Sequence, residues 1–243
     1  MFIDIVIPVL NEEEILEKNI TKVLSFLEKN NLNACSIIIA DNGSTDKTEV
    51  IGLELQKKFT NVKYQKISSV GVGRALKEAW LSSNAEVVGY MDGDLATDLN
   101  HLLDVYKEFE NPNAKIVVGS RLLKQSKVIN RTLFREITSR TFNFLVKILL
   151  GVHFSDGMCG FKFFRTDVAK NLINKGIPTN SWIFSTEILA KAEWSGIKII
   201  EIPLIWVDDI NRKSKAKVFS LAIAYINHLL KLRKEKNNWI STK

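Results

Sequence analysis

Short apolar runs alternate with longer amphipathic segments through the first half of the chain. Between the first two runs, apolar residues such as Ile15, Ile20 and Leu27 recur at helical spacing. Strands that alternate with helices in this way are typical of a parallel, doubly wound sheet. We therefore predict an α/β fold with a mostly parallel central sheet flanked by helices. The predicted strands cover residues 2–9, 36–40, 62–67, 87–91 and 114–119, and the clearest helices cover residues 12–29 and 98–110.

The second half of the chain is predicted to contain longer helices. Residues 131–150 show a long helical pattern, in which we expect Phe142 and Phe144 to pack in the core. A second helix is predicted at residues 181–194, and Glu187 lies inside it.

The last predicted strand, at residues 197–207, is interrupted by Pro203. Because proline has no backbone N–H to donate, we expect this strand at an edge of the sheet. Residues 1–210 are predicted to form the main domain. Residues 211–243 are expected to add a basic loop and an amphipathic C-terminal helix to the same domain.

Two carboxylates separated by one glycine follow the strand predicted at residues 87–91. Ligands of open α/β sheets bind beyond the carboxyl ends of the strands, so Asp92 and Asp94 lie where a site is expected. Both side chains project to one side if the chain stays extended there. Two oxygen ligands suit Mg²⁺ or Mn²⁺ carrying a diphosphate. The pattern alone is more often a strand-ending turn, because Asp and Gly are favoured there.

Composition and charge narrow the class of protein. Of the 243 residues, 46% are apolar, which is ample for a buried core. Cys35 and Cys159 have no metal-ligand spacing, and we expect free thiols in a reducing compartment. A strand begins directly at the N-terminus, so no secretion signal is expected. The glycine pair Gly71 and Gly73 lacks the third glycine of a dinucleotide fingerprint, and a nicotinamide cofactor is not expected.

The net charge of +7 indicates an anionic partner, which is a nucleic acid, a membrane surface or a phosphorylated substrate. Basic runs at residues 212–217 and 231–236 bracket an apolar stretch, residues 218–230. That stretch is shorter than the roughly 20 residues that span a bilayer. We expect a cytoplasmic protein that is peripheral on the cytoplasmic face of an anionic membrane, with no transmembrane segment. The bases that would meet the lipid are Arg212, Lys213, Lys215 and Lys217.

Taken together, five motifs resemble the family 2 glycosyltransferases of GT-A fold. The resemblance is to the group of polyprenyl-phosphate sugar transferases, which includes dolichyl-phosphate β-glucosyltransferase and dolichol-phosphate mannosyltransferase. It runs from Ile3 to about Lys217, and the segment from Trp182 to Lys215 is more similar to the glucosyl branch. The motifs lie at residues 8–12, 41–46, 92–94, 119–121 and 159–164.

The resemblance implies a donor site for a UDP- or GDP-hexose. Pro8, Asn11, Glu12 and Asp41 would hold the base and ribose. Asp92 and Asp94 would face the diphosphate, with Asp94 as the main metal ligand. The same site would include Gly73 and Asn42, which stands where the family usually has a second aspartate.

The resemblance also implies an acceptor site for a polyprenyl phosphate. Arg121, Arg135 and Ser139 match positions that meet the lipid phosphate, and Lys215 matches a lysine of a mobile loop. The implied reaction is an inverting, metal-dependent transfer of a hexose. A phosphate monoester is already ionised at neutral pH and needs arginines to hold it rather than a general base.

Two other functions remain open at this point. In the first, the acceptor is a hydroxyl group of a lipid or glycan, and Glu187 or Asp156 acts as the general base. In the second, the chain is a non-enzymatic basic binder of nucleic acid. The sequence shows no recognisable nucleic-acid motif, so we do not expect nucleic acid as a partner.

Overall fold

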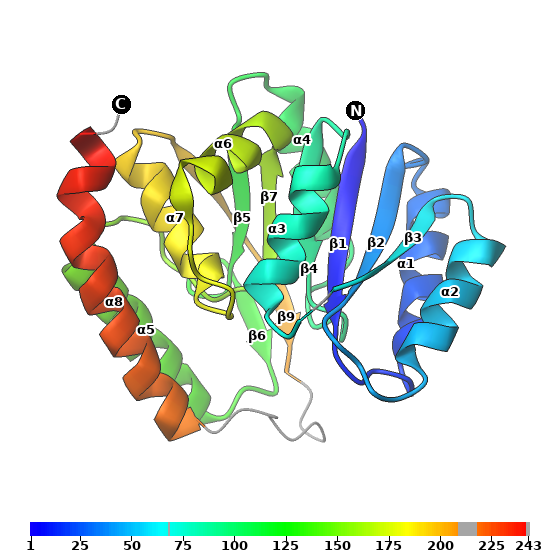
Figure 1. Ribbon diagram of the computed structural model, residues 1–243, viewed down its shortest axis with the longest axis horizontal. Helices are drawn as coiled ribbons and strands as arrows, with labels where there is room; N and C mark the ends of the chain where they lie inside the picture. The colour runs from blue at the N-terminus through cyan, green and yellow to red at the C-terminus, as the bar shows by residue number, and fades with distance from the viewer. Residues whose placement is uncertain (68, 209–217, 242–243) are drawn as a thin grey trace.

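The computed structural model describes residues 1–67, 69–208 and 218–241, and it shows an α/β fold (Figure 1). Its strands are β1 (Ile3–Val9), β2 (Cys35–Asp41), β3 (Val62–Lys66), β4 (Val87–Met91), β5 (Ile116–Ser120), β6 (Lys127–Ile129), β7 (Phe161–Arg165), β8 (Ile199–Pro203) and β9 (Ile205–Val207). Its helices are α1 (Leu16–Lys29), α2 (Thr48–Lys58), α3 (Val72–Ser82), α4 (His101–Glu110), α5 (Leu133–Leu150), α6 (Thr166–Gly176), α7 (Phe184–Trp194) and α8 (Val218–Ser241).

The central sheet has seven strands in the order β3-β2-β1-β4-β7-β5-β8. All neighbours pair in parallel except β7, which runs antiparallel between β4 and β5. The predicted mostly parallel sheet is therefore confirmed. Pro203 ends the edge strand β8, as its missing N–H predicted. A second, small sheet pairs β6 with β9.

This topology brings several strand ends to one edge of the sheet. The carboxyl ends of β1, β2, β4 and β5 point the same way, and the amino end of the antiparallel β7 lies among them. In Figure 1 this is the lower edge, where α3, α5 and α8 also begin. The loops at this edge carry most of the residues to which the sequence assigned a role.

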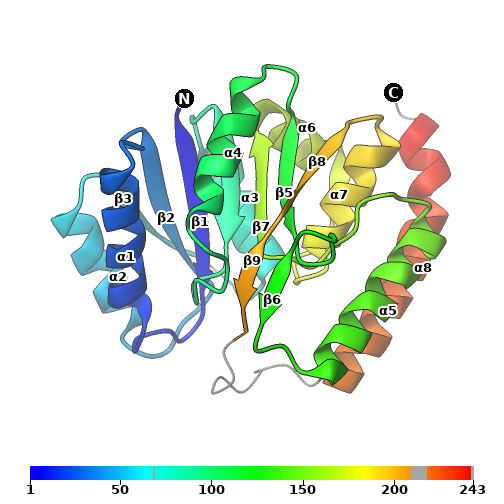
Figure 2. The same ribbon diagram turned by 180° about the vertical axis from the view of Figure 1, so that it is seen from behind.

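Strand β4 separates two apolar cores because successive side chains point to opposite faces. Val88 and Tyr90 pack in one core, whereas Val87 and Met91 pack in the other. Helices α3, α6 and α7 cover the first face (Figure 1), and α1 and α4 cover the second (Figure 2). Gly89 leaves room for the ring of Phe163 on the neighbouring strand, since a Cβ there would overlap it.

Helices α5 and α8 lie side by side at one end of the molecule and run in the same direction (Figures 1 and 2). The rings of Phe142 and Tyr225 are 5.9 Å apart, so Phe142 packs as predicted. Phe144 is 62% exposed, and its predicted place in the core was wrong. Within the described residues, no helix is both long and apolar enough to cross a membrane.

Trp239 anchors the last turns of α8 on the rest of the fold. Its side chain is buried, and its indole N–H donates to the carbonyl of Lys191 and to Ser195 Oγ at 3.0 Å each. The amines of Lys175 and Lys191 lie 4.4 and 4.7 Å from the ring, within the range of cation–π attraction. The indole therefore holds α8 against α6 and α7.

Replacing Trp239 with alanine should lower the free energy of unfolding by about 3–5 kcal/mol, because a large buried side chain is lost. Ile240→Ala is the matched control, since Ile240 is the next residue along α8 and is 40% exposed. Urea denaturation measures both variants. Equal losses would show that Trp239 does not anchor the helix.

Candidate functional site

The loops after β1 and β2 are joined by hydrogen bonds that shape one wall of the site. The backbone N–H of Asn11 donates to Ser44 Oγ at 2.9 Å, and that of Glu12 donates to Thr48 Oγ1 at 2.9 Å. Asn11 Oδ1 accepts from the N–H of Thr45 at 2.8 Å. Asn11 has a φ of 54°, a backbone conformation that asparagine tolerates better than most residues. The structure thus brings Asn11 and Glu12 to the start of α2.

Asp41 ends β2 beside this wall and is almost fully buried. Its Oδ1 accepts from the N–H of Ser44 at 2.8 Å, and its Oδ2 accepts from the hydroxyl of Tyr64 at 2.7 Å. Pro8 on β1 pairs with Ala40, the residue before Asp41 on the neighbouring strand β2. Pro8, Asn11, Glu12 and Asp41 therefore share one edge, as the resemblance implies.

Asn42 connects this wall to the start of α3. Its Oδ1 accepts from the N–H of Gly71 at 2.6 Å. Gly71 has a φ of 153°, and a Cβ there would overlap the carbonyl of Asn180, so only glycine suits the position. Gly73 is explained by packing, because a Cβ would overlap Phe184 on α7. Its role toward the donor stays a prediction.

Asp92 and Asp94 follow β4 at the centre of the same edge. The N–H of Asp92 donates to the carbonyl of Gly160 at 3.1 Å, and a Cβ on Gly160 would overlap the Asp92 carboxylate. The side chain of Asp94 is exposed, and its Oδ1 accepts from the N–H of Ala96 at 3.2 Å. Asn19 on α1 fixes the intervening turn by donating to the carbonyl of Gly93 at 2.7 Å.

These two carboxylates fit a Mg²⁺ or Mn²⁺ ion that is shared with a substrate diphosphate. Hard cations of this kind are bound by one or two carboxylates together with phosphate oxygens and water. No cluster of three or more metal-binding side chains occurs in the described part of the chain. With a diphosphate supplying further oxygens, Asp92 and the exposed Asp94 would be the residues that hold such an ion.

Arg121 and Asp156 form an ion pair next to the Asp92 turn. Arg121 Nε and NH2 donate to the two carboxylate oxygens at 2.7 and 2.9 Å, and the Asp156 side chain is fully buried. Burial alone would raise the pKa of Asp156, but the charge and hydrogen bonds of Arg121 outweigh it and lower the pKa to about 2. One edge of the Arg121 fork is thus occupied by Asp156, and the side chain is 12% exposed.

Lys162 is a buried cation beside this pair that the sequence analysis did not single out. It lies on β7 opposite Tyr90 of β4, and its amine donates to the carbonyl of Cys159. Burial lowers the pKa of Lys162 to about 8. A charged residue within the otherwise apolar run at residues 161–164 is the sequence feature that could have identified it.

The predicted acceptor residues come together only in part. Arg135 lies in the first turn of α5, and its side chain is 43% exposed. Ser139 lies one turn later and is half-buried, and its carbonyl accepts from Asn143 at 3.0 Å. Lys215, like the other bases of residues 212–217, lies outside the described residues.

Two residues that the sequence analysis did not assign to the site, Arg131 and Asp208, connect Arg135 to the sheet. Arg131 Nε donates to Asp208 Oδ2 at 3.1 Å, and Arg135 NH1 lies 3.6 Å from Asp208 Oδ1. Trp206 precedes Asp208 on β9, and the guanidinium of Arg121 lies 4.8 Å from its ring centre. A continuous set of contacts therefore runs from Asp156 through Arg121 and Trp206 to α5.

Glu187 lies in the first turn of α7, and its carboxylate forms ion pairs within α7 and with α8. Its carboxylate is fully buried and lies 2.7 Å from the amine of Lys191 and 3.3 Å from His228 Nε2 on α8. Burial alone would raise the pKa of Glu187, but these two partners keep it below its usual value. The structure gives Glu187 the role of tying α7 to α8.

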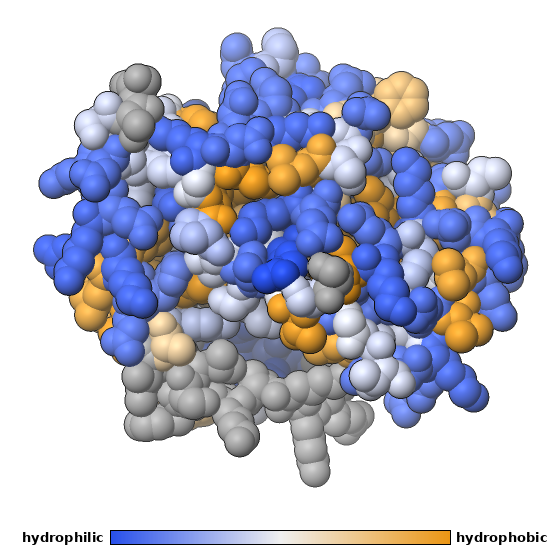
Figure 3. All heavy atoms as spheres, in the orientation of Figure 1, coloured by the Kyte–Doolittle hydropathy of each residue, from blue (hydrophilic) through white to orange (hydrophobic). Residues whose placement is uncertain are grey.

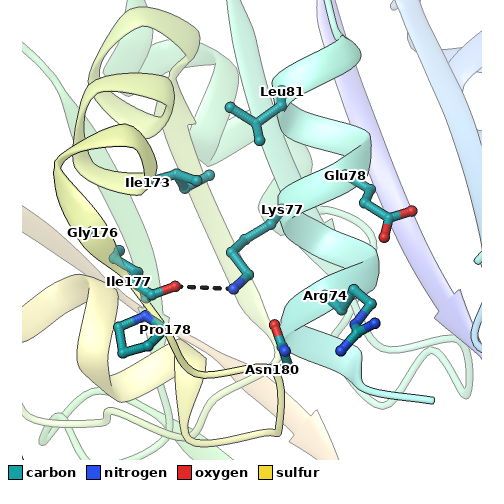
Figure 4. A pocket seen from close by; sticks show the side chains of 9 residues that line it. All are labelled: Arg74, Lys77, Glu78, Leu81, Ile173, Gly176, Ile177, Pro178 and Asn180. Carbon is teal, nitrogen blue, oxygen red and sulfur yellow. Dashed lines mark hydrogen bonds between the residues drawn. The ribbon is translucent and has the colours of Figure 1, made fainter. Parts of the chain in front are cut away.

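A depression of about 560 Å³ between α3 and α6 is separate from the site (Figure 4). It is lined by residues such as Arg74, Lys77 and Pro178, and by none of the predicted site residues. The amine of Lys77 donates to the carbonyl of Ile177 at 2.9 Å. The face that carries it is mainly hydrophilic, with apolar groups set apart from one another (Figure 3).

Comparison with known proteins places the chain in a family. Residues 4–173 match the model of glycosyl transferase family 2. Glycosyltransferase AglD of Haloferax volcanii is 29% identical over 84% of this chain, which spans only 33% of that protein. Dolichyl-phosphate beta-glucosyltransferase ALG5D of Trichomonas vaginalis is 30% identical over 88% of this chain and 68% of the length of that protein. The dolichyl-phosphate beta-glucosyltransferase of Saccharomyces cerevisiae is 28% identical over 92% of this chain and 72% of the length of that protein.

Solved structures support the same fold. Glucosyl-3-phosphoglycerate synthase from Mycobacterium tuberculosis in complex with uridine-diphosphate superposes with a TM-score of 0.68 at 17% identity, covering 96% of this chain and 80% of that chain. A complex of the same protein with Mn²⁺, uridine-diphosphate and glucosyl-3-phosphoglycerate gives a TM-score of 0.65 at 16% identity, covering 97% and 79%. The predicted GT-A fold is confirmed, and with the family match over most of the chain it follows that this protein belongs to glycosyl transferase family 2.

Proposed function

We propose that the protein transfers glucose from UDP-glucose to a polyprenyl phosphate at a membrane surface, with inversion at the sugar. One observation carries this proposal. The same edge of the sheet presents the exposed carboxylate of Asp94 and a chain of contacts that leads to the exposed Arg135. Relatives named dolichyl-phosphate beta-glucosyltransferases support both the glucosyl group and the phosphate acceptor.

The donor half of the site would hold the nucleotide and its diphosphate. Asp94, with Asp92 behind it, would bind a Mg²⁺ or Mn²⁺ ion, which supplies positive charge for the leaving diphosphate. Structural neighbours crystallised with Mn²⁺ or Mg²⁺ and uridine-diphosphate support this use of the fold. The wall formed by Asn11, Glu12 and Asp41 would hold the base and ribose.

The acceptor half would hold a phosphate monoester that is already ionised. Arg135 offers a planar, permanently charged fork suited to phosphate oxygens. Arg121 would contribute a positive charge held in place by Asp156. Ser139, one turn after Arg135, would add a hydroxyl. No residue has to remove a proton from such an acceptor.

A hydroxyl acceptor would need a general base, and both candidates suit that role poorly. The pKa of Asp156 is held at about 2 by Arg121, so its carboxylate is a weak proton acceptor near neutral pH. Glu187 is fully buried against Lys191 and His228. The ion pairs of these two carboxylates make each a poor general base, which favours the phosphate acceptor over the hydroxyl alternative.

The outward face of α5 supports attachment to a membrane. Five large apolar side chains on this helix are between 55% and 76% exposed. They recur at helical spacing and so form one stripe along α5, whereas Arg135 lies on another face of the helix. Exposed apolar stripes flanked by bases are typical of helices that lie in a lipid interface. We call this the α5 stripe; it consists of Leu133, Phe134, Ile137, Phe144 and Ile148.

A panel of donors and acceptors tests the proposed reaction. UDP-glucose, GDP-mannose and UDP-N-acetylglucosamine, each radiolabelled, are offered with a polyprenyl phosphate or with the corresponding prenol. We expect transfer from UDP-glucose to the phosphate only. Transfer to the prenol would favour the hydroxyl alternative, and a preference for GDP-mannose would correct the donor.

Replacing Asp94 with alanine should lower the transfer rate about 100-fold or more while the protein stays folded, because the exposed carboxylate serves the ion and not the core. EDTA should have the same effect on the unaltered enzyme. Asp167→Ala is the control, since this exposed carboxylate begins α6 at the opposite end of the sheet. Full activity of the Asp94 variant in metal-free buffer would refute the metal site.

Replacing Arg135 with lysine should raise the KM for the polyprenyl phosphate about fivefold to tenfold, because lysine keeps the charge but loses the fork. Arg140→Lys, also exposed on α5, should leave that KM near its original value. Steady-state kinetics with each substrate varied separately give the comparison. A change confined to the donor KM would show that the phosphate site is assigned wrongly.

The double substitution Phe134→Ser and Phe144→Ser should weaken binding to anionic vesicles at least about fivefold, because two large apolar side chains no longer enter the lipid. This loss should persist at high salt, whereas binding through bases falls as salt rises. Val50→Ser with Leu53→Ser on α2, at residues that are 55% and 39% exposed, is the control. Unchanged sedimentation of the α5 variant with vesicles would exclude the stripe as a membrane contact.

A further inference from the structure

Asp208 follows β9 and is contacted by side chains from two elements. Its Oδ1 accepts from the indole N–H of Trp206 at 2.9 Å, and its Oδ2 accepts from Arg131 Nε at 3.1 Å. Its side chain is only 10% exposed. Burial alone would raise the pKa of Asp208, but the hydrogen bonds from Trp206 and Arg131 outweigh it and keep the pKa below its usual value. The carboxylate is therefore charged at neutral pH.

The two arginines beside Asp208 differ in what they have left to offer. Arg131 is 8% exposed and is held by Asp208 on one side and by Glu136, at 3.3 Å, on the other. Arg135 is 43% exposed, and its NH1 lies 3.6 Å from Asp208 Oδ1. That distance is too long for a good hydrogen bond but close enough for attraction between charges. Asp208 thus attracts one end of the Arg135 fork and leaves the rest exposed.

Trp206 connects this carboxylate to the donor side of the site. Its N–H binds Asp208, while its ring lies 4.8 Å from the guanidinium of Arg121. Arg121 is itself fixed by two hydrogen bonds to the buried Asp156. The position of Asp208 relative to Arg121 is therefore set by packed, buried side chains rather than by a surface loop.

We propose that Asp208 is a positioning residue that holds Arg135 where the acceptor phosphate binds, at a fixed distance from Arg121. The proposal rests on the proposed function, since it needs a phosphate acceptor. An exposed arginine loses side-chain freedom when it binds a ligand, and ordering it beforehand lowers that cost. Asp208 supplies the ordering through its charge, and its own oxygens stay occupied by Trp206 and Arg131.

A carboxylate close to an anion site has a second, opposite effect. Its negative charge repels the phosphate, so a purely electrostatic role predicts tighter acceptor binding when the charge is removed. A positioning role predicts weaker binding. The sign of the change in acceptor KM therefore distinguishes the two.

The experiment compares Asp208→Asn with Glu136→Gln, which removes the same charge from the same cluster but does not contact Arg135. We expect Asp208→Asn to raise the KM for polyprenyl phosphate about threefold to fivefold, which is the size of effect expected for the loss of a partly exposed ion pair. The KM for the donor serves as the internal reference. Glu136→Gln should leave the acceptor KM near its original value. Thermal unfolding of each variant verifies that it is folded, and Asp208→Glu should restore part of the loss.

A double-mutant cycle tests whether Asp208 acts through Arg135. In an Arg135→Ala background, Asp208→Asn should cause no further rise in the acceptor KM. An unchanged or lower KM in the single variant, or the same rise in both backgrounds, would overturn the inference. If the unaltered enzyme does not use polyprenyl phosphate at all, the proposed function itself fails, and that result is seen before any variant is compared.

Discussion

The buried ion pair between Arg121 and Asp156 is the interaction on which the site depends. A carboxylate without solvent contact is strongly destabilising unless it is paired and hydrogen-bonded, and Arg121 satisfies both oxygens. Arg121 follows β5, whereas Asp156 precedes the antiparallel β7. The pair therefore ties together the two loops beside the Asp92 turn. Removing one partner of such a pair costs about 3–5 kcal/mol, because the other charge stays buried.

The same arginine relates the donor half of the site to the acceptor half. On one side it interacts electrostatically with Asp92 after β4, and on the other its guanidinium packs on Trp206. Through Trp206 and Asp208 the contacts reach Arg131, just before α5, and Arg135 on α5. The helix that carries the exposed arginine also carries the α5 stripe.

The sequence predicted those features that depend on local patterns. The strand runs and the edge position of Pro203 follow from neighbouring residues and were found as predicted, whereas the chain turns at residues 93–94 and does not stay extended through Asp94. The antiparallel insertion of β7 could not be predicted, because strand pairing is a contact between distant segments. Phe144 was misplaced since the pattern of α5 does not show which apolar face α8 covers. Asp208 was not assigned a role because its partners Arg131 and Arg135 are far away in the sequence.

The central claim is that one edge of the sheet holds the donor diphosphate at Asp94 and the acceptor phosphate at Arg135. A crystal structure with uridine-diphosphate, Mn²⁺ and a short-chain prenyl phosphate measures both positions directly. The account predicts an anomalous manganese signal within coordination distance of the Asp94 carboxylate and a prenyl phosphate hydrogen-bonded to Arg135. Manganese bound elsewhere, or a phosphate that does not contact Arg135, would contradict it.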